Sequence, residues 1–154
     1  MEYDTRKEER VWQRVRSEKT EQAAENRPDP LPAWIMEQLE LSASYLQLSR
    51  LLQGKDGAEF VKLARESRAQ AVCLKGILSL MTGHSAQIVA APVHFSAVDT
   101  MLRSCYGKEL RLMKEYESRS SDPEYGPVYE RLSKRGREHC YILLEMVGKT
   151  GKPK

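Results

Sequence analysis

The chain contains few cysteines and few large aromatic residues. Its 154 residues include three cysteines, two phenylalanines and two tryptophans. The cysteines, Cys73, Cys105 and Cys140, are odd in number and form no Cys-x-x-Cys pair, which argues against a disulfide framework. So few aromatic residues suit a helical protein better than a β-sandwich or barrel. With 40% hydrophobic and 31% charged residues, the composition favours a single soluble helical domain.

Long apolar runs are also missing. No stretch of about 18 apolar residues occurs, so we expect no membrane-spanning helix, and the charged residues within 1–10 do not allow the apolar core of a signal peptide. The expected compartment is therefore the cytoplasm. The net charge is +3, but residues 1–27 carry as many basic as acidic side chains, and the excess lies at Lys149, Lys152 and Lys154. We therefore expect neither a nucleic-acid nor a membrane partner.

Turn residues divide the chain into a short amino-terminal segment, four long helices and a tail. Residues 1–32 are expected to form a charged helix, with Trp12 docking on the bundle or on another subunit, and a proline-rich linker. Helices are predicted over 33–52, 58–81, 95–119 and 124–147, within a bundle domain at 33–148, followed by a basic tail at 149–154. Gly54 to Gly57 is expected to form a turn, and Gly83 and Gly148 to end helices. The link from Gly83 to Pro92 is longer than a tight hairpin needs, so we expect a crossover connection that makes the second and third helices parallel.

Each predicted helix carries an apolar stripe that is interrupted by a polar or missing side chain at mid-length. In the second helix, the stripe consists of Phe60, Leu63, Ser67, Gln70, Leu74, Ile77 and Met81. The corresponding stripes contain Gln38 and Tyr45 in the first helix, Glu109 and Tyr116 in the third, and Gly136 and His139 in the fourth. Such a pattern is typical of a bundle with a site, or the remains of one, at its centre.

An internal repeat connects the four interruptions. Gln38 and Tyr45 match Glu109 and Tyr116 at an offset of 71, and Ser67 matches Gly136 at an offset of 69. Two near-equal offsets indicate two copies of one helical hairpin. The matched positions are therefore expected to surround a common centre.

These positions are those of a carboxylate-bridged pair of metal ions. Such a centre takes one glutamate from each of two helices and a Glu-x-x-His motif from each of the other two. Here the ligand positions hold Gln38, Ser67, Gln70, Glu109, Gly136 and His139, so only Glu109 and His139 keep a ligand-type side chain. The nearby acids Glu40, Glu66 and Glu138 lie one or two residues off the stripes, and a one-residue shift rotates a helical side chain by about 100°. We therefore expect these acids to face away from the centre.

Three segments of the chain resemble the rubrerythrin-like branch of the ferritin-like superfamily. They are Leu63-Ala64-Arg65-Glu66-Ser67-Arg68-Ala69-Gln70-Ala71 with Leu78 to Gly83, Leu102 to Tyr106 with Glu109 and Tyr116, and Pro127-Val128-Tyr129 with Leu132, His139-Cys140 and Leu143-Leu144. The resemblance covers roughly residues 33–148. It implies an all-α, ferritin-like four-helix bundle with a crossover connection, in a family that binds two iron ions and handles peroxide, oxygen or iron. Four of the six ligand positions depart from the family pattern, and no Cys-x-x-Cys pair for a rubredoxin-type iron centre is present.

We therefore expect a degenerate ferritin-like bundle with a structural or interaction role, without catalytic residues and without a resident cofactor. Tyr45 and Tyr116 are expected to hydrogen-bond the polar residues around the vestigial site. The alternative is a metal-dependent redox, peroxidase or iron-handling protein, with a single or partially occupied transition metal ion at Glu109 and His139. The expected partner is a second copy of the chain, in a homodimer.

Overall fold

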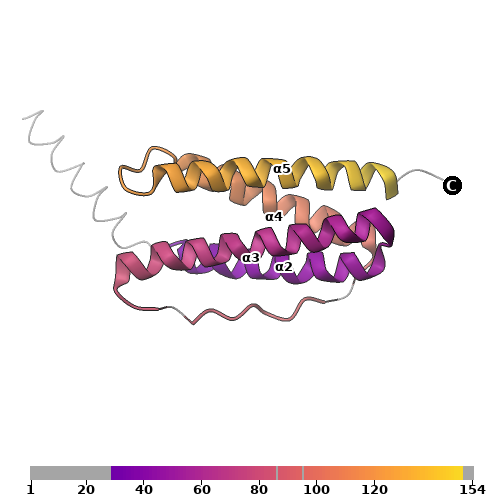
Figure 1. Cartoon of the computed structure of the whole chain (residues 1–154), viewed down its shortest axis with the longest axis horizontal. Coiled ribbons are helices and arrows are strands. Elements are labelled where there is room, and N and C mark those ends of the chain that lie inside the picture. The colour runs from indigo at the N-terminus through magenta and orange to yellow at the C-terminus, as the bar shows by residue number, and fades with distance from the viewer. Residues whose placement is uncertain (1–28, 86, 95, 151–154) are drawn as a thin grey trace, which may run out of the picture. The chain divides into compact units, whose positions relative to one another are not determined.

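The computed structural model describes residues 29–85, 87–94 and 96–150, and over these ranges the protein is all-α, as the composition predicts. The four helices belong to one compact unit that begins at Leu31 (Figure 1). They are α2 (Leu31–Leu51), α3 (Gly54–Thr82), α4 (Val98–Ser118) and α5 (Gly126–Thr150), and the described residues contain no strand. The expected amino-terminal helix with Trp12, and most of the basic tail, lie outside the described residues.

Three helix ends lie three or more residues from their predicted positions, and two of these differences concern glycine. The expected turn from Gly54 to Gly57 is instead the first turn of α3, which begins four residues earlier than predicted. A β-carbon on Gly57 would lie 2.5 Å from the backbone oxygen of Leu52 and 2.9 Å from that of Ser49 in α2, so glycine allows the start of α3 to approach the end of α2 closely. The expected stop at Gly148 is wrong because α5 continues through it to Thr150. At the third end, α4 begins at Val98, three residues later than predicted.

The end of α3 follows the prediction. Gly83 adopts a left-handed conformation with φ of 75°, and its N–H donates to the carbonyl oxygen of Ser79. This arrangement ends helices because glycine has no β-carbon to clash in that region.

Residue pairs across the helix interfaces establish the directions of the helices. The pairs are Gln38–Gln70 and Tyr45–Phe60 between α2 and α3, Gln38–Tyr116 and Tyr45–Glu109 between α2 and α4, and Glu109–His139 and Tyr116–Tyr129 between α4 and α5. Within each set, residue numbers rise along one helix as they fall along the other. Neighbouring helices in each set are therefore antiparallel, and α3 and α4, both antiparallel to α2, are parallel to each other.

The connection between α3 and α4 runs along the side of the helical unit (Figure 1). It leaves one end of the bundle after Gly83 and reaches the start of α4 at the other end. Two contacts attach it to the helices. Gln47 donates from Nε2 to the backbone oxygen of Val93 at 3.3 Å, and Ile88 packs against the core.

Apolar residues of all four helices form the core. Its largest fully buried side chains include Tyr45, Phe60, Tyr116 and Tyr129. Met81, which was expected to belong to the buried stripe, is exposed. Because Gln70 pairs with Gln38 in antiparallel helices, the level of Met81 lies beyond the start of α2, so that the last turn of α3 has no α2 neighbour.

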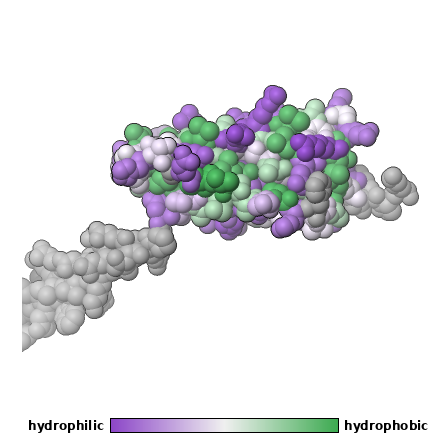
Figure 2. Space-filling view, turned by 90° about the horizontal axis from the view of Figure 1, so that it is seen from below, coloured by the Kyte–Doolittle hydropathy of each residue, from purple (hydrophilic) through white to green (hydrophobic). Residues whose placement is uncertain are grey.

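On the face shown in Figure 2, apolar side chains lie among polar ones over the helical unit. The most exposed large apolar side chains are Leu80, Val89 and Tyr141. None of the helices in the described part of the chain has the length and apolar character that a membrane crossing requires.

Candidate functional site: a buried polar layer at mid-bundle

The structure brings the interrupted positions together inside the bundle, and we call them the polar layer. Gln38, Ser67, Glu109 and His139 are fully buried, and Gln70 is 5% exposed. Gly136 is buried as well. The members come from all four helices, α2, α3, α4 and α5. The helical period that predicted four separate interruptions thus places them at one level of the core.

One half of the polar layer is neutral. Gln38 donates from Nε2 to Oε1 of Gln70 at 2.7 Å and to the hydroxyl of Tyr116 at 3.0 Å. These bonds connect α2 with both α3 and α4. The amide groups therefore join the helices without any charge. A neutral, hydrogen-bonded amide is much less costly to bury than a carboxylate.

The other half is charged and is centred on His139. The Tyr45 hydroxyl donates to Oε1 of Glu109 at 2.7 Å, and Nδ1 of His139 lies 2.9 Å from the same oxygen. On the opposite side of the ring, Nε2 of His139 lies 2.6 Å from Oε2 of Glu66. Because an ionised carboxylate oxygen only accepts hydrogen bonds, donation from both ring nitrogens to ionised Glu109 and Glu66 requires a protonated imidazole.

The electrostatics of the layer support this protonation state. Burial, the largest single influence, lowers the pKa of His139, but the hydrogen bonds and negative charges of Glu109 and Glu66 together outweigh it and raise the pKa above its ordinary value. For Tyr45, burial and the charge of Glu109 shift the pKa in the same direction. Together they raise it well above that of a free phenol. Tyr45 is therefore a neutral donor to Glu109.

The expectation that Glu66 faces away from the centre is wrong. Its side chain is 23% exposed, and it contacts both His139 and Arg135 of α5. A residue beside the buried stripe points along the interface with the next helix rather than into solvent, as flanking positions do in coiled coils. A flexible glutamate at such a position reaches a histidine on the facing helix without any shift of helix register.

The two other neighbouring acids lie outside the polar layer, as expected. Glu138 is exposed and pairs with Arg135 at 3.1 Å, and Glu40 pairs with Lys108 at 3.4 Å. Neither acid contacts Glu109 or His139 through any hydrogen bond or ion pair within the described residues.

Met113 occupies the space that Gly136 leaves, and the sequence did not single it out. A β-carbon on Gly136 would lie 3.2 Å from Cβ of Met113, so α4 and α5 approach closely here. Met113 is four residues after Glu109 and therefore lies on the same face of α4. The missing side chain on α5 was visible in the sequence, whereas the side chain that fills its place was not.

Several buried polar atoms of the layer have no hydrogen-bond partner among the described residues. They are Oε1 of Gln38, Oγ of Ser67, Nε2 of Gln70 and Oε2 of Glu109. The set combines acceptors with a donor and a hydroxyl, and such groups in other proteins bond ordered water.

With both ring nitrogens donating, His139 offers no lone pair to a metal ion. A histidine ligand presents a lone pair to the metal, but here Nδ1 and Nε2 of His139 both donate to carboxylates. Among the described residues, no group of three or more histidine, cysteine, aspartate or glutamate side chains is arranged to hold a metal. Glu109 and His139 are adjacent, as a shared metal site requires, yet their contact is a charge-assisted hydrogen bond.

The cysteines take no part in the polar layer. All three are free thiols, with Cys105 and Cys140 buried and Cys73 half-buried. Burial raises the pKa of Cys105 to about 12 and that of Cys140 to about 11. These thiols remain protonated at neutral pH, as expected for small residues within a core.

Comparisons with protein-family models, with curated proteins and with solved structures found no match to the chain.

Proposed function

We propose that the protein is a degenerate ferritin-like bundle with a structural or interaction role, in which a protonated histidine stands where the family holds metal. The observation that carries the proposal is the position of His139 between Glu109 and Glu66, with 2.9 Å and 2.6 Å contacts at its two ring nitrogens. The parallel course of α3 and α4 supports a ferritin-like topology, with residues 83–97 as its crossover connection.

Charge balance explains how a bundle of this kind dispenses with metal. A di-iron centre uses four carboxylates to offset the charge of two metal ions. In this chain, Gln38, Ser67 and Gly136 supply none of those carboxylates. The one acid that remains at a ligand position, Glu109, is offset by the proton on His139, while Glu66 is offset by His139 and Arg135. The layer thereby satisfies the requirement that a buried charge be paired and hydrogen-bonded.

A polar layer of this kind specifies how the helices pair. Its hydrogen bonds join α2 to α3 and α4, and α5 to α3 and α4, with lengths of 2.6–3.0 Å. A change in register would break several of these bonds at once, as a buried polar residue does in a coiled coil. We propose that the rigid bundle presents an outer helix face to a second copy of the chain, and that its free thiols match the reducing cytoplasm. Multi-angle light scattering tests the dimer, and a monomer at all concentrations would contradict it.

The competing function is metal-dependent redox, peroxidase or iron-handling activity at Glu109 and His139. It is favoured by one observation, the direct contact of these two side chains inside the bundle. It requires His139 to lose a proton and release one carboxylate, because a ring nitrogen binds metal only through its lone pair.

Metal analysis separates the two functions. Protein purified without chelator would be analysed for transition metals and titrated anaerobically with Fe(II) before exposure to oxygen. We expect less than about 0.2 equivalents of any transition metal and no oxo-to-iron charge-transfer band. About two iron ions per chain with such a band would refute the proposal. E109Q and H139Q should abolish any specific metal signal, whereas the exposed E138Q serves as the control on the same helix as His139.

A further inference from the structure

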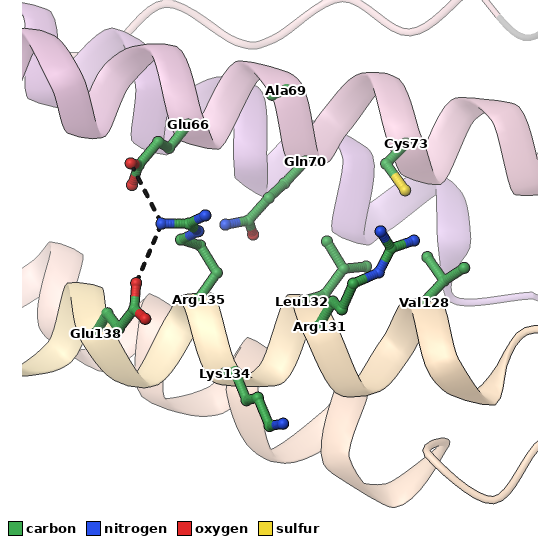
Figure 3. A pocket seen from close by; sticks show the side chains of 10 residues that line it. All are labelled: Glu66, Ala69, Gln70, Cys73, Val128, Arg131, Leu132, Lys134, Arg135 and Glu138. Atoms are coloured by element: carbon green, nitrogen blue, oxygen red, sulfur yellow. Dashed lines mark hydrogen bonds and ion pairs between the residues drawn. The ribbon is translucent and has the colours of Figure 1, made fainter.

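A groove of about 480 Å³ lies between α3 and α5, and Figure 3 shows the side chains that line it. It adjoins the polar layer, since Gln70 and Glu66 belong to its lining. We call this cavity the α3/α5 groove. Its volume falls within the range typical of small-molecule pockets in proteins.

Two groups in the groove are unpaired donors. Nε2 of Gln70 has no hydrogen-bond partner among the described residues, although the side chain is only 5% exposed. Figure 3 shows this side chain pointing between the two helices toward Arg135, with Leu132 between its amide and Arg131. The second group is the guanidinium of Arg131, which lies near Cys73 and forms no ion pair with a carboxylate in the described part of the chain.

The other charges of the groove are already compensated. Arg135 lies between Glu66 and Glu138, with N–O distances of 3.5 Å and 3.1 Å, as the dashed lines in Figure 3 show. Lys134 lies 3.6 Å from a carboxylate oxygen of Glu130. The groove therefore has an acidic, neutralised end and, around Arg131, a site with one unbalanced positive charge.

Apolar side chains form much of the wall between these polar groups. Val128 and Leu132 line it from α5, and Ala69 and Cys73 line it from α3. An apolar wall with few directed polar groups is typical of pockets for amphipathic small molecules.

We propose that the α3/α5 groove binds a small organic carboxylate with an apolar body. The carboxylate would accept from the guanidinium of Arg131, and the apolar body would pack on Val128 and Leu132. One unbalanced cation matches a single negative charge. A phosphate dianion fits less well, because its second charge would face the carboxylates of Glu66 and Glu138 without a free cation to offset it.

Octanoate is the probe for this site, with octanamide as the uncharged molecule of the same length. The full chain would be titrated with each compound by isothermal titration calorimetry. We expect saturable binding of one octanoate per chain with a Kd on the order of 1 mM or tighter, as suits about ten non-hydrogen atoms. Octanamide should bind at least about tenfold more weakly, and inorganic phosphate should show no saturable binding. Equal binding of octanoate and octanamide would overturn the proposal.

Two substitutions locate the site. R131Q should weaken octanoate binding at least about tenfold, whereas R137Q, which removes the same charge from an exposed position of α5 outside the groove, should leave it unchanged. A69W should abolish binding by filling the groove while every charge is kept, and Ala69 is exposed, so the fold tolerates the larger side chain. Circular dichroism checks that each variant is folded. Equal losses in R131Q and R137Q, or normal binding by a folded A69W, would refute the site.

This inference does not depend on the ferritin-like origin of the bundle. The octanoate titration involves no metal, and the metal analysis described above is insensitive to a carboxylate in the groove. Failure of one proposal is therefore distinguishable from failure of the other.

Discussion

Replacing His139 with glutamine is expected to destabilise the protein by about 3–5 kcal/mol, the usual cost of removing one partner from a buried ion pair. The side chains of His139 and Glu109 are each only 1% exposed, so water cannot take over the role of the imidazolium. The substitution keeps a side chain able to hydrogen-bond but leaves the carboxylate of Glu109 buried without a cation. Glu66 suffers less, because it is 23% exposed and keeps its contact with Arg135.

A second substitution separates the charge from the hydrogen bonds. E109Q alone should cost about 1–2 kcal/mol, since His139 keeps Glu66 as a counter-charge while Tyr45 retains an oxygen to donate to. The double variant H139Q/E109Q removes both buried charges and should lie within about 1–2 kcal/mol of the wild type. It should therefore be more stable than the sum of the single effects predicts, by about 2 kcal/mol or more.

Urea unfolding followed by far-ultraviolet circular dichroism measures these differences. The midpoints should shift while the slope m stays constant, which would show that the native stability changed and not the extent of unfolding. E138Q provides the control, because Glu138 is an exposed acid of α5 outside the polar layer. Additive effects of H139Q and E109Q would refute the buried ion pair.

The stability difference between wild type and H139Q should also depend on pH. Because the folded protein raises the pKa of His139, the unfolded chain loses the imidazole proton first as the pH rises. The stabilisation is therefore fully present below the unfolded pKa of about 6.5 and is lost as the pH rises through the higher folded pKa. Repeating the urea series from about pH 6 upward tests this sign. A wild-type advantage that grows with pH in this range would contradict a protonated His139.

Two further predictions concern the core. G57A should destabilise the protein by about 2 kcal/mol or more, because the new β-carbon would lie 2.5 Å from a backbone oxygen. G76A, in the same helix with nothing within 4 Å of the new β-carbon, should instead stabilise it by about 0.5–1 kcal/mol. Iodoacetamide should alkylate native Cys73 well before Cys105 and Cys140, because those thiols are buried and burial raises their pKa to about 12 and about 11. Mass spectrometry of the alkylated peptides gives the order, and equal rates at all three cysteines would show that the core opens readily.

Most of the polar layer was predictable from the helical period alone. Gln38, Gln70, Glu109 and His139 were assigned to buried stripes because residues three and four apart share one face of a helix, and all four are buried in the structure. The expected hydrogen-bonding role of Tyr45 is a consequence of the same spacing, and the structure places its hydroxyl 2.7 Å from Glu109.

Helix boundaries were less predictable, and glycine shows why. Gly54, Gly83 and Gly148 were each expected to follow a helix end, and α2 does end at Leu51, before Gly54, as α3 ends at Thr82, before Gly83. Gly148 stays helical within α5. Whether a glycine ends a helix depends on the left-handed conformation of that residue and on its neighbours, which local composition does not specify.

The sequence by itself therefore determined the all-α class, the presence of the four helices and most of the side chains that face the core, since these follow from periodicity and composition within single segments. Only the tertiary structure decided that Glu66 bonds His139, that Met113 lies against Gly136, and that Gln70 and Arg131 face one groove. Each of these contacts joins helices that are distant along the chain. Such contacts depend on the distance between helix axes and on the reach of flexible side chains, and the pattern of residues along one helix encodes neither.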